Sequence, residues 1–196
     1  MSARNPPDRW GAVSQALHWL IVVLLVTMAW LGLTMTDLPN TPHKARLYGL
    51  HKSIGLTLLA LAVLRLGWRL YAGAPRELEG IPRWQRRIAQ ATHAALYLLL
   101  FVIPLSGWVI NSASGFPLRW FGLFRVPALT ARDAALNALA KDWHVALFWT
   151  LVALASVHAA AALYHHLFQR DATLVRMLPR GWLRSPSPSP HRESPP

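Results

Sequence analysis

Cysteine is absent from the 196-residue sequence, and acidic residues are scarce, with eight Asp and Glu against 20 Lys and Arg. Without cysteine the chain has no disulfide, no thiolate metal ligand, no iron–sulfur cluster and no covalent c-type haem attachment. Any metal chemistry must therefore use histidine or carboxylate ligands. Charged residues of both signs make up only 14% of the chain, where a soluble domain carries about 25%. This deficit indicates a membrane protein.

The few charged residues are unevenly spread, which argues against the nucleic-acid binding that a net charge of +12 would otherwise suggest. They are absent from residues 11–36, 88–118 and 143–169, and each of these runs exceeds the roughly 20 residues that cross a bilayer. A fourth apolar run, 53–64, extends past Arg65 and Arg69, whose long side chains can reach the headgroups. The runs are continuously apolar, whereas the strands of a membrane β-barrel alternate apolar and polar residues, so the pattern indicates helices.

We therefore predict an all-α integral membrane four-helix bundle, with spans at about 12–36, 48–71, 88–111 and 143–168. The first span is too long for a signal-peptide core and lacks an evident cleavage site, so we expect it to be retained. Residues 1–183 form the membrane domain in this interpretation. The Pro- and Ser-rich tail, 184–196, cannot bury enough apolar surface to fold, and we expect it to be disordered.

Lys and Arg residues predict the orientation of these spans. The termini and the second connection carry 13 of them, and the first and third connections carry 7. By the positive-inside rule both termini are cytoplasmic. The third connection, 111–142, then faces outward, with four aromatic residues at the membrane interface: Phe116, Trp120, Phe121 and Phe124.

Histidines are the most informative residues inside the spans, where ionisable side chains are costly. His144 and His158 are 14 residues apart, so on one helix they project from nearly the same face, about 21 Å apart along the axis. His51 lies at the depth of His144, and His18 lies at the depth of His158. A single histidine in a span is more often a packing residue, but two pairs at matched depths favour metal ligation.

Two imidazoles at each depth suit two stacked haem irons with both axial positions filled, an arrangement for electron transfer. His93 lies near the depth of His18, where it could compete as a ligand or contact a quinone. Arg65, 14 residues after His51, could bind a haem propionate or simply reach the membrane surface. Gly32 and Gly107 allow close approach of a flat cofactor or of another helix.

The motifs around these histidines resemble the bacterial cytochrome b561 family. They are LHWLIV at His18, GLHKSIGL and VLRLGWRL at His51 and Arg65, THAALYLLLFVIPLSGWV at His93, DWHVALF at His144 and VHAAAALYHHLFQRDATLVRMLPR at His158. Together they cover most of residues 9–180. The resemblance implies a di-haem, quinone-linked cytochrome of the inner membrane. It also implies noncovalent haem b, with the inner haem on His18 and His158 and the outer haem on His51 and His144.

The resemblance further implies ubiquinone as an electron partner and, for some members, superoxide as the periplasmic donor. The leading interpretation is a di-haem b oxidoreductase that moves electrons between a periplasmic donor and ubiquinone. One alternative is a cytochrome b membrane anchor that passes electrons for a hydrogenase or dehydrogenase. Another is a histidine-based metal-ion transporter, but the predicted spans contain no Asp or Glu.

Overall fold

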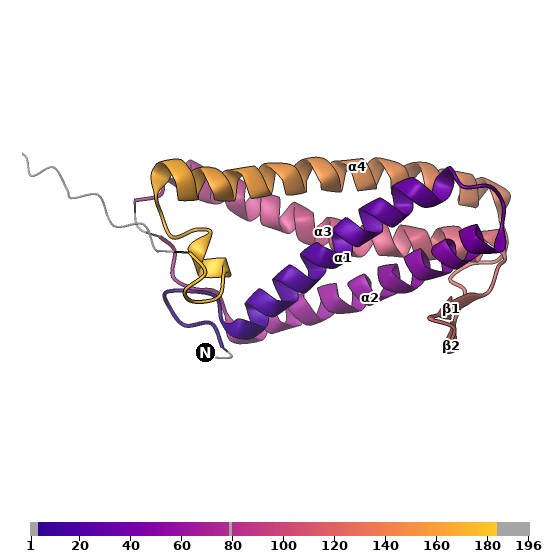
Figure 1. Cartoon of the computed structure of the whole chain (residues 1–196), viewed down its shortest axis with the longest axis horizontal. Coiled ribbons are helices and arrows are strands. Elements are labelled where there is room, and N and C mark those ends of the chain that lie inside the picture. The colour runs from indigo at the N-terminus through magenta and orange to yellow at the C-terminus, as the bar shows by residue number, and fades with distance from the viewer. Residues whose placement is uncertain (1–3, 79, 184–196) are drawn as a thin grey trace, which may run out of the picture.

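The computed structural model describes residues 4–78 and 80–183, and four long helices dominate it (Figure 1). They are α1 (Ala12–Thr36), α2 (Pro42–Ala72), α3 (Arg83–Ser114) and α4 (Ala134–Tyr164). All four are long and apolar enough to cross a membrane. The predicted all-α four-helix architecture is confirmed. The predicted tail, 184–196, lies outside the described residues.

Three helices, α2, α3 and α4, begin earlier than the predicted spans, and polar side chains cap the first and the last of these. The Thr41 hydroxyl accepts a hydrogen bond from the Lys44 amide and Pro42 opens α2, while an oxygen of the Asp133 carboxylate accepts one from the Leu136 amide at the start of α4. Such caps satisfy amide groups that the first helical turn leaves without partners. Hydropathy locates the apolar part of a helix and misses these polar turns.

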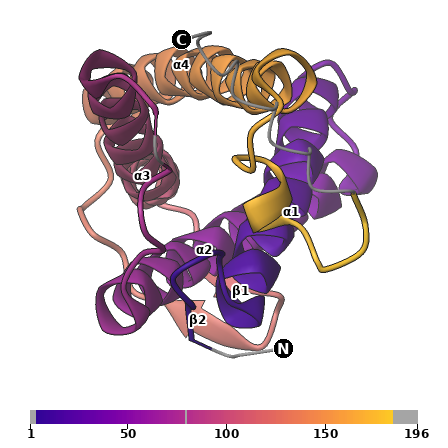
Figure 2. The same cartoon turned by 90° about the vertical axis from the view of Figure 1, so that its left-hand side faces the viewer.

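Helices that follow one another in sequence pack side by side, α1 on α2, α2 on α3 and α3 on α4. Viewed along the bundle, the four helices surround a common centre in this order (Figure 2). Residues from three helices form the main apolar cluster: Ile21, Leu31, Ile54, Leu58, Ala62 and Leu100. Within the described residues, α4 buries only Ala140 and Leu151. The protein core is therefore concentrated where α1 meets α2.

Both described ends of the chain lie at one end of the bundle. After α4 the chain forms the π-helical turn η1 (His165–Gln169) and the short 3-10 helix η2 (Val175–Met177). The Trp10 amide donates to the carbonyl of Arg176 at 3.2 Å, and the Arg76 amide donates to the carbonyl of Pro7 at 2.9 Å. The N-terminal segment, the α2–α3 connection and the C-terminal segment are thus joined, as an even number of spans requires.

The opposite end carries a β-hairpin, in a segment where the sequence predicted a connection without strands. Strands β1 (Leu118–Trp120) and β2 (Phe124–Val126) pair antiparallel. The hairpin is attached to α2 by side chains: the Trp120 indole donates to the Thr57 hydroxyl at 3.1 Å, and the Phe121 amide donates to the Ser53 hydroxyl at 2.9 Å. The Trp120 side chain and the backbone of Phe121 therefore lie against the second helix.

Candidate functional site

Four of the predicted histidines form two pairs, each joining α4 to another helix. The ring centres of His51 on α2 and His144 on α4 are 6.3 Å apart. Those of His18 on α1 and His158 on α4 are 6.5 Å apart. His144 and His158 are separated by about 21 Å along α4. The structure thus brings together the residues that the sequence paired by depth.

Both ring separations have the size that one iron between two imidazoles requires. Since a ligating imidazole nitrogen lies about 2 Å from its metal and about 1 Å from its own ring centre, two imidazoles on opposite sides of one iron have centres about 6 Å apart. Among residues 4–78 and 80–183, no three His, Cys, Asp or Glu side chains are grouped to hold a metal ion by themselves. Two imidazoles and a porphyrin together would complete such a site, so the residues fit haem.

His93, from α3, is the third histidine of the His18–His158 group. Its ring centre is 5.2 Å from that of His158, with the rings at 70°. This separation is about 1 Å too short for an iron between the two rings. The arrangement is an edge-to-face contact between aromatic rings, which favours His18 over His93 as the partner of His158.

Ser106 determines which nitrogen of His144 is free. Its hydroxyl oxygen is 2.8 Å from the Ile103 carbonyl oxygen and 2.8 Å from Nδ1 of His144. A carbonyl can only accept, so satisfying both contacts gives the hydroxyl proton to Ile103 and makes Nδ1–H of His144 the donor to Ser106. Nε2 of His144 then keeps its lone pair, as a metal ligand must.

Glycines lie beside both histidines of the His51–His144 pair. A Cβ added to Gly32 on α1 would be 3.4 Å from Cε1 of His51, and one added to Gly107 on α3 would be 3.4 Å from Cε1 of His144. Each imidazole therefore lies against the backbone of a neighbouring helix. Nδ1 of His51 is buried and has no hydrogen-bond partner in the described part of the chain.

Arg65 contacts the first turn of α1. It is half-buried, and its Nη1 donates to the carbonyl of Ser14 at 2.9 Å. Ser14 lies one helical turn before His18, so this bond holds the guanidinium near the His18–His158 group. Arginine has five N–H donors, and the remaining ones could bind an acidic group such as a propionate.

Spacing along one helix could not reveal Ser106 or the packing of the two glycines. Ser106 acts on a histidine of another helix, and the contact depends on how α3 and α4 pack. Its position beside Gly107, in the segment that follows Pro104, was visible in the sequence. That position carried no signal for hydrogen bonding.

The model of the prokaryotic cytochrome b561 family matches residues 9–180 of the chain. Cytochrome b561 homolog 2 of Escherichia coli strain K12 is 42% identical over 181 residues, which cover 91% of this chain and 95% of that protein. Cytochrome b561 homolog 1 of the same organism is 29% identical, with 88% and 98% covered.

A protein of Yersinia pestis named probable superoxide oxidase CybB is 28% identical over 172 residues, with 88% of this chain and 97% of that protein covered. The matched region contains all four helices and every histidine of the two pairs. The chain therefore belongs to the prokaryotic cytochrome b561 family of membrane electron-transfer proteins.

Proposed function

We propose that the chain holds two haems b, one at each histidine pair, and carries electrons between a periplasmic donor and ubiquinone. The main observation in support is that α4 supplies one histidine to each of two pairs at two depths, with ring centres 6.5 and 6.3 Å apart. Bound haem b supplies reversible one-electron oxidation and reduction. Two such groups along one helix would bridge most of the membrane.

The chain's own residues would bind and orient these groups. His51 and His144 are the ligands of the outer haem, and His18 and His158 are those of the inner haem. Ser106 keeps the proton of His144 on Nδ1 and so directs Nε2 to the iron. Arg65, held by the Ser14 carbonyl, binds a propionate at the inner site. The apolar helices around both sites exclude water.

In the proposed topology the bundle lies in the bacterial inner membrane with both termini cytoplasmic. The end where the N-terminal and C-terminal segments meet belongs to the connections with more Lys and Arg, and such ends are retained in the cytoplasm. The β1–β2 hairpin then faces the periplasm. Residues 1–183 form the membrane domain, and we propose that the tail, 184–196, can be removed without loss of haem.

Superoxide is the proposed periplasmic donor, and charge on the hairpin supports this. Arg119 of β1 is the direct cross-strand partner of Arg125 of β2. Like charges in facing strand positions are destabilising, but together they attract small anions. The hairpin is attached to Ser53 and Thr57 on the helix that carries His51, so these arginines lie at the same end of the bundle as the His51–His144 pair.

Two measurements test the proposal. The purified protein, saturated with haem, should contain about two low-spin b-type haems per chain in its reduced-minus-oxidised spectrum. A superoxide-generating system should reduce these haems, superoxide dismutase should prevent the reduction, and added ubiquinone should reoxidise them. Saturation at one haem would contradict the two-site arrangement. A reduction rate that dismutase leaves unchanged would exclude superoxide as the donor.

A further inference from the structure

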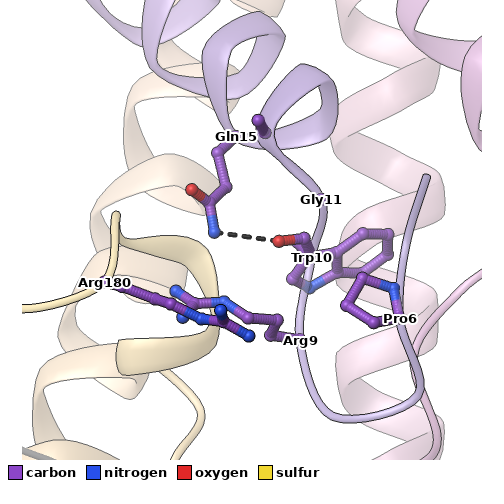
Figure 3. A pocket seen from close by; sticks show the side chains of 7 residues that line it. Pro6, Arg9, Trp10, Gly11, Gln15 and Arg180 are labelled. Atoms are coloured by element: carbon purple, nitrogen blue, oxygen red, sulfur yellow. Dashed lines mark hydrogen bonds between the residues drawn. The ribbon is translucent and has the colours of Figure 1, made fainter. Parts of the chain in front are cut away.

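The end of the bundle that carries both chain termini holds a cavity of about 220 Å³. It lies between the segment that leads into α1 and the residues that follow η2. Arg9, Trp10 and Gln15 line it from the N-terminal side, and Arg180 lines it from the C-terminal side (Figure 3). Two distant parts of the sequence therefore build one cavity, and electron transfer between the histidine pairs does not use it.

Hydrogen bonds to backbone carbonyls fix the wall of this cavity. Gln15 is only 6% exposed. Its Nε2 donates to the Trp10 carbonyl at 2.9 Å (Figure 3) and lies 3.2 Å from each of the carbonyl oxygens of Arg176 and Leu178. Nη2 of Arg9 also donates to the Leu178 carbonyl. The N-terminal and C-terminal walls are thus held together, with Arg9 oriented by the contact.

Positive charge in the cavity is not neutralised by the described residues. Within residues 4–78 and 80–183, the ion pairs are Arg86 with Glu77 and His165 with Asp171, and neither Arg9 nor Arg180 takes part in one. No acidic residue lines the cavity. Two guanidinium groups beside one cavity repel each other, and an anion between them would remove that repulsion. Their planar forks match the oxygens of a phosphate group.

The position of the cavity points to a phosphate that belongs to a lipid. It lies at the first turn of α1, where the span begins. Further along the same helix the Trp19 indole donates to the Met177 carbonyl at 2.9 Å, and tryptophan is enriched at the level of the headgroups. Deeper in the span, Val23 and Val26 are 60% and 67% exposed. These side chains offer an apolar surface to acyl chains.

We propose that this cavity binds the phosphate group of an anionic phospholipid, with Arg9 and Arg180 on the phosphate oxygens and the acyl chains along α1. The lipid would bridge the two chain ends that already meet through Gln15. It would therefore stabilise the docking of the C-terminal segment on α1. This inference does not depend on the identity of the electron donor or acceptor.

Thermal unfolding of the full-length haem protein in uncharged detergent tests the proposal, with tryptophan fluorescence as the signal. Phosphatidylglycerol should raise the Tm, whereas phosphatidylcholine and inorganic phosphate at the same concentration should not. In Arg180→Gln the phosphatidylglycerol concentration for half of the effect should rise about tenfold or more, because a charged hydrogen bond is lost. Arg9→Gln should act in the same direction.

A double variant, Arg83→Gln with Arg87→Gln, is the matched control, because it removes positive charge at the same end of the bundle but outside the cavity. It should keep the wild-type response to phosphatidylglycerol. Arg9→Gln also loses the contact with Leu178 and could unfold for that reason. Arg180 makes no hydrogen bond among the described residues. A weaker response to phosphatidylglycerol in Arg180→Gln can therefore be attributed to the lost phosphate contact, and this variant is the decisive one. A wild-type response in Arg180→Gln, an equal loss in the control, or equal stabilisation by inorganic phosphate would each overturn the lipid assignment.

Discussion

The imidazole rings of His18 and His158 lie 6.5 Å apart, although one belongs to the first helix and the other to the last. Four connected helices in cyclic order bring α1 and α4 close enough for this contact (Figure 2). The same helix α4 also carries His144, whose ring lies 6.3 Å from that of His51. A displacement of α4 would therefore alter both pairs, and a change in α1 or α2 would alter one.

The two pairs predict which histidine substitutions have matching effects. His144→Ala should remove the same spectral component as His51→Ala, and His158→Ala the same component as His18→Ala, because each haem needs both of its axial ligands. His93→Ala should leave both components in place. Reduced-minus-oxidised spectra at low temperature, with the haem content per chain, provide the measurement. If His93→Ala lost the inner haem while His18→Ala retained it, the second ligand of the inner haem would be His93 and not His18.

Ser106→Ala should raise the midpoint potential of the outer haem without removing the haem. The Ser106 hydroxyl accepts from Nδ1–H of His144, and such a bond makes the imidazole a stronger electron donor, which favours the oxidised iron. A net hydrogen-bond energy of about 0.5–1.5 kcal/mol corresponds to a shift of about 20–60 mV for one electron. Redox titration measures this shift. Ser106→Thr, which keeps the hydroxyl, is the control and should restore the wild-type potential.

Side-chain size at position 107 should control occupancy of the outer site. A Cβ at Gly107 would be 3.4 Å from Cε1 of His144, so Gly107→Ala should be tolerated and Gly107→Leu should displace the ring and lower the outer haem content. Gly67→Leu is the matched control, because a Cβ there meets no atom within 4 Å. Haem content per chain is the readout. Equal losses in the two leucine variants would mean that the helix, not the imidazole, is disturbed.

Much of the architecture followed from the sequence because a bilayer constrains it so strongly. Apolar runs without charge can satisfy their backbone only as helices, and the 14-residue interval between His144 and His158 determines their relative direction on one helix. The β1–β2 hairpin was missed because its strands are three residues each. The aromatic residues in and beside it predicted a place at the membrane interface, which stays a prediction, and gave no indication of strand pairing.

The spacing of residues along one helix does not predict which residues of another helix they contact. The bond of Ser106 to His144, the position of Gly32 beside His51 and the bond of Arg65 to Ser14 each depend on the rotation of one helix about its axis relative to another. The sequence left two roles open for the glycines and two for Arg65. Ring separations also distinguish His18 from His93, and hydropathy cannot provide such distances.

Docking of the C-terminal segment should weaken in acid. Partial burial raises the pKa of the Asp171 carboxyl. Hydrogen bonds from Thr173 and the contact with His165 lower this pKa by more than burial raises it, so it lies below its ordinary value. A depressed pKa stabilises the fold above the ordinary value of about 4, and this contribution is lost as the pH falls through the lowered pKa. Asp171→Asn should lower the Tm at pH 7, and the difference from wild type should shrink below about pH 4. A difference independent of pH would contradict this role of the carboxylate.

Neutralising one arginine of the hairpin should slow reduction by superoxide in a manner that depends on salt. Arg119 and Arg125 face each other across β1 and β2, and their combined field should raise the rate at which an anion reaches the outer site. At about 0.01 M ionic strength this field extends roughly 30 Å, and at about 0.1 M roughly 10 Å. Arg125→Gln should therefore reduce the second-order rate several-fold at low ionic strength and much less at high ionic strength.

The charge-matched control for this experiment is Arg87→Gln, at the opposite end of the bundle, which should keep the wild-type rate at every salt concentration. Arg125→Gln also removes a repulsion between facing strand positions, so the variant should unfold no earlier than the wild type. Stopped-flow reduction of the haems and thermal unfolding together separate the two effects. A slower rate that persists unchanged at high salt would point to a local change in the hairpin, because attraction of an anion from a distance must weaken as mobile ions screen the arginines.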